Sequence, residues 1–119
     1  MVLDTTACTQ TLRSGIGLSP TNRARLDALT TLDLIEFVHD RCLSALTPTP
    51  LAGAVALHPT CSAIKLGLGG KLTAIARACS AHAEVPPDWA CCGFAGDRGL
   101  LRPELTAKAT AREAANLAA

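Results

Sequence analysis

The sequence has few aromatic residues and no large excess of either charge. It contains no tyrosine, one tryptophan and two phenylalanines among 119 residues, so a hydrophobic core must be built from aliphatic side chains. Eleven Lys and Arg residues stand against ten Asp and Glu residues, giving a formal net charge of +1. This balance excludes a strongly basic nucleic-acid-binding domain and an acidic tail. Hydrophobic residues make up 49% of the chain, which argues against disorder.

The sequence also lacks a long uninterrupted apolar run. The longest uncharged stretch lies between Arg41 and Lys65, and three prolines and a histidine interrupt it, so we expect no transmembrane segment. The first residues, Met1–Cys8, carry neither the basic nor the apolar region of a secretory signal. We therefore expect a cytoplasmic protein in which disulfides are disfavoured, although six cysteines would formally allow a disulfide framework.

Short apolar runs alternate with helical patterns along the chain. The stretch Arg13–Arg25 carries two glycines and a proline and is typical of an exposed loop. The alternation predicts an α/β fold with a small, mainly parallel sheet flanked by helices. We expect strands at Met1–Asp4, Gly53–Leu57 and Ala83–Val85, and helices at Thr31–Leu46, Lys71–Ala81 and from Pro103 to the end of the chain.

The six cysteines fall into two groups. Cys42 and Cys79 lie on the apolar faces of predicted helices, where free cysteine is usually a small buried hydrophobe. The other four follow predicted strands, in loops that contain Thr, Pro or Gly, and strand ends of this kind form the sites of α/β folds. We predict that these four thiols form a metal site: Cys8, Cys61, Cys91 and Cys92.

The spacing of these four thiols favours one class of metal site. Soft thiolates suit zinc or an iron–sulfur cluster. The sequence has no C-x-x-C pair, which most structural zinc sites contain, and the adjacent Cys91 and Cys92 are awkward for one tetrahedral ion. A larger cluster with several irons fits adjacent ligands better, while four unrelated loop cysteines are the plainer alternative.

The residues around these cysteines add to the predicted site. Gly93 and Gly96 let the backbone come close to a bulky cluster and offer N–H groups to its sulfurs. His58 precedes Cys61 in the same loop. A cysteine nucleophile with His58 as its base is a competing hypothesis, but the sequence identifies no third group that would orient the histidine.

Several motifs resemble the cysteine-rich CCG domain. That domain occurs in the heterodisulfide reductase B subunit, in glycolate oxidase iron–sulfur subunits and in D-lactate dehydrogenases that contain FAD and iron–sulfur clusters. The dehydrogenase group is the most similar, and the likeness covers nearly the whole chain, 1–119. The matching segments are Asp4–Thr9, Ile35–Asp40, Val55–Cys61, Gly67–Leu72 and Cys91–Gly99, the last reading CCGFAGDRG.

The resemblance implies a function that the pattern alone does not give. It implies an electron-transfer domain of an FAD-linked D-2-hydroxyacid dehydrogenase, with a 4Fe-4S type cluster on the four cysteines and His58 hydrogen-bonded near it. FAD would belong to the parent enzyme, and the partners would be its flavin and ferredoxin-like domains or subunits. These would allow peripheral association with the cytoplasmic face of a membrane. The alternative is a zinc-binding or metal-free interaction module that keeps the fold without redox activity.

Two parts of the family pattern lie outside these 119 residues. Family members carry a further cysteine segment after this region, and flavin and ferredoxin-like motifs before it. We therefore expect the chain to be a partial CCG-type domain, the C-terminal portion of a longer oxidoreductase. We also expect apolar surface to be exposed where neighbouring parts would pack.

Overall fold

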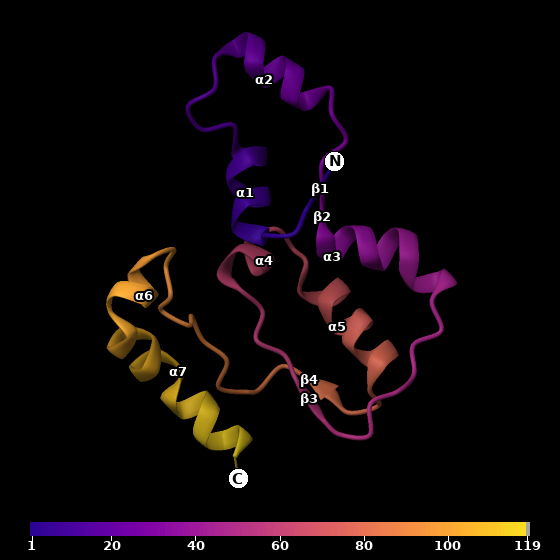
Figure 1. Ribbon diagram of the computed structural model, residues 1–119, viewed down its shortest axis with the longest axis vertical. Helices are drawn as coiled ribbons and strands as arrows, with labels where there is room; N and C mark the ends of the chain where they lie inside the picture. Colours follow the sequence, from indigo (N-terminus) through magenta and orange to yellow (C-terminus); the bar gives the residue numbers. More distant parts are fainter. Residues whose placement is uncertain (119) are drawn as a thin grey trace.

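The strands of the protein pair in parallel, but they form two small sheets rather than one. A computed structural model describes residues 1–118 (Figure 1). Strand β1 (Val2–Leu3) lies beside β2 (Leu32–Asp33), and β3 (Val55–Ala56) lies beside β4 (Ala83–Glu84). The predicted α/β class, with parallel pairing and flanking helices, is confirmed. The sequence predicts one sheet, whereas the structure has two separate sheets of two strands each.

Helices make up most of the fold, and the three predicted helices are all present with shifted bounds. A π turn (Val38–Cys42) and a 3₁₀ turn (Leu43–Ala45) continue α3, so that this helical segment runs from Leu34 to Ala45. The α-helices are α1 (Thr6–Ser14), α2 (Pro20–Asp27), α3 (Leu34–Phe37), α4 (Cys61–Lys65), α5 (Gly69–Cys79), α6 (Arg98–Leu101) and α7 (Pro103–Leu117).

The loop predicted for Arg13–Arg25 is wrong in its second half, where α2 begins. Ser19 caps this helix, because its hydroxyl accepts a hydrogen bond from the Asn22 N–H at 3.3 Å. Pro20 follows at the first helical position, where its missing N–H costs nothing. Gly15 and Gly17, both with positive φ, are confined to the turn between α1 and α2. The Ser19 cap thus starts a helix in a stretch whose composition is typical of a loop.

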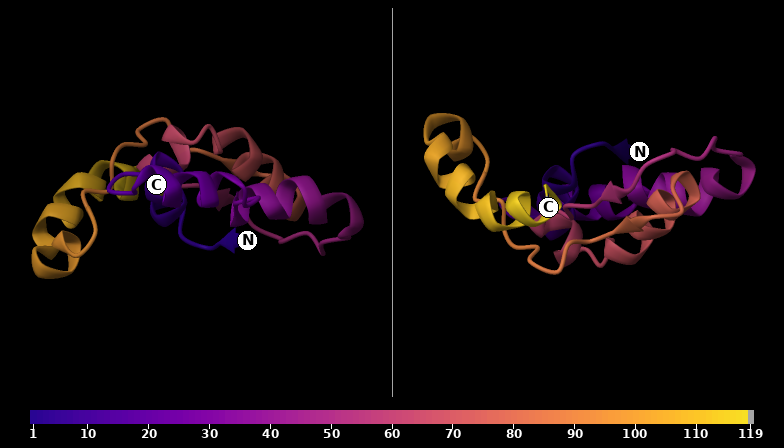
Figure 2. Two further views of the ribbon diagram at one scale, coloured as in Figure 1. Left: turned by 90° about the horizontal axis from the view of Figure 1, so that it is seen from above. Right: turned by 90° about the horizontal axis from the view of Figure 1, so that it is seen from below.

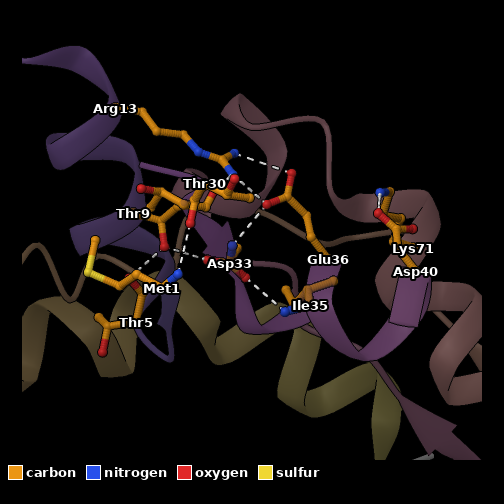
Figure 3. Close-up of polar contacts among 11 residues, drawn as sticks. Met1, Thr5, Thr9, Arg13, Thr30, Asp33, Ile35, Glu36, Asp40 and Lys71 are labelled. Atoms are coloured by element: carbon orange, nitrogen blue, oxygen red, sulfur yellow. Dashed lines mark hydrogen bonds and ion pairs between the residues drawn. The ribbon is translucent and has the colours of Figure 1, made fainter. Parts of the chain in front are cut away.

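A network of polar side chains ties the N-terminal segment to α3 (Figure 3). Asp33, fully buried, accepts hydrogen bonds from the Thr9 hydroxyl at 2.8 Å and from the Ile35 N–H at 3.0 Å. Glu36 accepts from the Asp33 N–H at 2.8 Å, which completes a capping box. Arg13 of α1 forms an ion pair with Glu36 at 2.6 Å. Asp33 is thus the N-cap of α3.

The core is small and aliphatic, as the composition predicts. Leu57, Ala76 and Ala83 form its centre, and Leu68 and Ala63 are also buried. The molecule measures 53 × 41 × 19 Å, and Figure 2 shows it as a thin layer with α6 and α7 forming an arm at one end. Its radius of gyration is 16.7 Å, against about 13.5 Å for a compact chain of this length. Within residues 1–118, no helix is both long and apolar enough to cross a membrane.

Candidate functional site

Three of the four predicted ligand cysteines line one open cleft. Cys61 is the first residue of α4, and Cys91 and Cys92 lie in the loop that follows β4. The cleft has a volume of about 580 Å³. Besides the cysteines, it is lined by Asp4–Ala7, Gln10, Thr60, Ser62, Lys65 and Phe94–Gly96. Segments far apart in the sequence therefore bring these thiols together.

Cys61 is positioned by the cap of α4. The Thr60 hydroxyl accepts a hydrogen bond from the Ala63 N–H at 3.2 Å, which fixes where the helix begins. Ser62 and Ala63 are buried, and α4 packs against α1. The Cys61 thiol remains exposed at the N-terminus of the helix and faces the cleft. Cys61 is therefore the first residue of a short helix, and its predicted loop position is wrong.

The two glycines predicted to assist the site serve different purposes. Gly93 has φ +69°, and a Cβ there would lie 3.3 Å from the Leu105 carbonyl oxygen and 3.2 Å from the Ala109 Cβ. The close approach that Gly93 permits is therefore to α7. Gly96 has φ +70° and lines the cleft, with nothing within 4 Å of the position of a Cβ. Backbone can reach a bound group most directly at Gly96.

The pKa values of Cys61 and Cys91 shift in opposite directions. The Gly93 N–H donates to the Cys91 sulfur and, together with a hydrogen bond from the Cys61 thiol, lowers the pKa of Cys91. The same thiol–thiol hydrogen bond, with desolvation and the nearby charges of Cys91 and Cys92, raises the pKa of Cys61. Negative charge is therefore favoured on Cys91. A cysteine nucleophile centred on Cys61 would need the opposite shift.

Cys8 lies outside this cleft. It is exposed on α1 and lines a neighbouring apolar hollow of about 390 Å³, whose wall shares Ala7 with the cleft. Cys42 and Cys79 are half-buried, and Cys79 lines a third hollow beside Val38 and Leu43. The structure thus keeps Cys42 and Cys79 apart from the cleft, and brings Cys8 next to it without placing it inside.

His58 contacts a buried carboxylate that no sequence motif marks. Its Nδ1 lies 2.8 and 2.9 Å from the two carboxylate oxygens of Glu113, which is buried on α7. The ring lies 6.1 Å from that of Trp89, whose Nε1 donates to the Pro59 carbonyl at 2.9 Å. Glu113 is thus the orienting group for His58. It is far away in sequence, on an alanine-rich helix with no motif to mark it.

The cleft presents three thiols as soft donors. Among the residues that the structure describes, no three His, Cys, Asp or Glu side chains are arranged to hold one metal ion. A tetrahedral zinc site needs four ligands at about 2.0–2.3 Å from one point. An iron–sulfur cluster offers several irons, so its thiolate ligands can be further apart. Cys61, Cys91 and Cys92 supply suitable soft donors around a cleft of about 580 Å³, and a fourth donor lies just beyond it.

Comparisons with family models, with curated proteins and with solved structures find no match to this chain. The similarity to CCG domains therefore rests on the sequence motifs themselves. The cleft brings Cys61 together with Cys91 and Cys92, which lie in separate segments of the sequence.

Proposed function

We propose that this chain is an iron–sulfur electron-transfer domain of an FAD-linked D-2-hydroxyacid dehydrogenase of the D-lactate type. The observation that carries the proposal is the cleft lined by Cys61, Cys91 and Cys92. Three soft donors from two separate segments, two of them adjacent in sequence, suit an iron–sulfur cluster. The CCGFAGDRG and HPTC motifs support the same assignment.

In this proposal the cysteines and glycines at the cleft have different roles. Cys61, Cys91 and Cys92 ligate a 4Fe-4S type cluster, and the Gly93 N–H hydrogen-bonds the Cys91 sulfur, which stabilises it as a thiolate. Gly96 keeps the wall free of side chains. Cys8 completes the ligand set by a local movement at the start of α1, because its neighbour Ala7 already lines the cleft.

The bound group would supply one-electron transfer between the FAD of the parent enzyme and an external acceptor. Hydride removal from the hydroxy acid belongs to the flavin part, so this chain holds no catalytic residue of its own. The proposed partners are flavin and ferredoxin-like domains or subunits, in the cytoplasm or at the cytoplasmic face of a membrane. His58, held by Glu113, supports the loop that carries Cys61.

One observation favours the alternative of a metal-free interaction module. Large apolar side chains are exposed at several places, including Ile16, Leu100 and Leu101 at 81%, 74% and 72%. Apolar surface of this kind is typical of contacts with another protein. A module that only binds a partner would not need Cys61, Cys91 or Cys92, so substitution of these residues separates the two functions.

The test is anaerobic reconstitution of the full chain with iron and sulfide, followed by visible absorption spectroscopy. We expect broad absorption in the wild type, its loss in Cys61→Ser and Cys92→Ser, and its retention in the matched controls Cys42→Ala and Cys79→Ala. Cys8→Ser is expected to reduce the absorption, because it removes the fourth ligand. Loss of absorption in Cys79→Ala would contradict the assignment, and so would full retention in Cys92→Ser.

A further inference from the structure

Lys65 brings a positive charge to the wall of the cysteine cleft. It is the last residue of α4, and Cys61 is the first residue of the same helix. Side chains four positions apart on a helix are neighbours on one face, with their Cβ atoms about 5–6 Å apart. Both residues line the cleft, so α4 places a cation and a thiol on the same wall.

The charge of Lys65 is not paired within the cleft. In the part of the chain that the structure describes, no carboxylate forms an ion pair with it, whereas Lys71 of α5 is paired with Asp40. The acidic residue among those that line the cleft is Asp4, whose carboxylate accepts a hydrogen bond from the Thr5 hydroxyl at 3.3 Å. The ammonium of Lys65 is therefore available to other negative charge that the cleft holds.

We propose that Lys65 is the counter-ion of the cleft, a residue that stabilises negative charge held at Cys61, Cys91 and Cys92. For a bound cluster, which rests on the proposed function, Lys65 holds the reduction potential more positive than it would be without this charge. Lys65 itself ligates no iron and takes up no electron.

The direction of this effect follows from charge. A 4Fe-4S core held by thiolates is negatively charged, and the electron that it receives from the reduced flavin adds one more negative charge. A nearby cation stabilises the reduced form more than the oxidised form, which raises the potential. One electron leaves the flavin and one reaches the cluster, and Lys65 keeps its protons throughout. Asp4, with the opposite charge on the same cleft, should act in the opposite direction.

Exposure gives the effect of Lys65 a signature of its own. The residue is exposed, and interactions between exposed charges are screened over about 8–10 Å at moderate ionic strength, so its influence should weaken as salt is added. A purely structural role, such as interaction with the last carbonyls of α4, would alter the free energy of unfolding. It would not give opposite effects at Lys65 and Asp4.

The first test compares two thiol reagents on the reduced, metal-free full chain. Dithiobis(nitrobenzoate) is negatively charged, and dithiodipyridine is neutral at the pH of the assay. The rate at Cys61 is measured with each reagent, and mass spectrometry identifies the modified residue. The ratio of the two rates cancels any change in the fraction of thiolate, so it reports the local charge. We expect Lys65→Gln to lower this ratio about two- to fivefold at low salt, and Lys65→Arg to retain it.

Two further variants serve as controls for this measurement. Arg25→Gln removes one positive charge from α2, where Arg25 lines a hollow that shares no residue with the cleft, and should leave the ratio unchanged. Asp4→Asn should raise the ratio. Circular dichroism identifies any variant that fails to fold, and Lys65→Arg separates loss of charge from loss of the side chain. An unchanged ratio in Lys65→Gln, or an equal fall in Arg25→Gln, would overturn the proposal.

The second test is an anaerobic redox titration of the reconstituted protein, followed by electron paramagnetic resonance. The midpoint potential should be more negative in Lys65→Gln and more positive in Asp4→Asn than in the wild type, and both differences should shrink at high salt. An unchanged or more positive midpoint in Lys65→Gln would also overturn the proposal. If the wild type binds no cluster, the electron-transfer function fails, whereas the reagent ratio still decides whether Lys65 acts on the cleft.

Discussion

Gly93 couples the backbone of the cysteine loop to the last helix. It follows directly after Cys92 and has φ +69°, and a Cβ there would lie 3.3 Å from the Leu105 carbonyl oxygen and 3.2 Å from the Ala109 Cβ of α7. Residues other than glycine rarely adopt this conformation, because the Cβ then crowds the following carbonyl oxygen. A larger residue at position 93 would therefore be strained in the loop that carries Cys91 and Cys92.

The first prediction concerns this residue. Gly93→Ala should destabilise the protein by about 2 kcal/mol, combining a left-handed backbone with close contacts to α7. The matched control is Gly70→Ala in α5, which is exposed and has nothing within 4 Å of the position of a Cβ, and which should stabilise by up to about 1 kcal/mol. Urea unfolding followed by circular dichroism measures both. Equal midpoints for the two variants would contradict the role given to Gly93.

At the scale of elements, a charged residue in the first turn of α3 links this helix to α1. Glu36 closes the capping box of α3 and reaches Arg13 of α1. Burial alone would raise the pKa of Glu36, but hydrogen bonds from Arg13 and from the Asp33 N–H, with the charges of Arg13 and Lys71, lower it. The folded state therefore holds the ionised carboxylate more strongly than the unfolded chain does.

The second prediction follows from the sign of that shift. Because the folded pKa of Glu36 is lowered, its contribution to stability is present above the ordinary value of 4.5 and is lost as the pH falls through the folded pKa. Glu36→Gln should lower the free energy of unfolding at neutral pH, and the difference from the wild type should shrink on acidification below about pH 4.5. Urea titrations across this range test it. A difference that grows toward acid pH would refute the assignment.

At the scale of the whole molecule, little of the chain is buried. The accessible surface is 7992 Å², compared with about 6,100 Å² for a compact monomer of this mass. Large apolar residues such as Leu100 remain exposed, whereas Leu68 is 2% exposed. The stability of the isolated chain must therefore depend on a few buried side chains.

The third prediction compares two leucines of the same chain. Leu68→Ala should cost about 2–5 kcal/mol, because it leaves a cavity among buried neighbours. Leu100→Ala, at a residue that is 74% exposed, should change the free energy of unfolding by less than about 0.5 kcal/mol. Thermal and urea unfolding of both variants measure the contrast. A similar cost at both positions would mean that α6 packs more closely than its exposure indicates.

Sequence patterns predicted the elements that depend on local signals. The strands near Val2, Val55 and Ala83 are short apolar runs with clear boundaries, and the helix beginning at Pro103 has a helix-initiating residue. The strand β2 at Leu32–Asp33 was missed because Leu32 continues the helical pattern of the residues after it. Its strand conformation depends on pairing with β1, a long-range contact that periodicity does not contain.

The candidate site was only partly predictable for the same reason. Their positions after predicted strands, in loops, indicated Cys61, Cys91 and Cys92 as site residues. The structure brings these three residues to one cleft. The separation of Cys8 arises from the course of α1, which directs it to a neighbouring hollow. The partnership of His58 with Glu113 depends on how α7 packs, and a single charged residue in an alanine-rich helix gives no sign of it.

The central claim is that the cleft binds an iron–sulfur cluster, and metal analysis tests it most directly. Iron, acid-labile sulfide and zinc should be measured per chain after anaerobic reconstitution with all three available. The account predicts iron and sulfide in equal amounts, about four of each per chain for a 4Fe-4S type cluster, with little zinc. A colourless protein with one zinc per chain and no sulfide would contradict it.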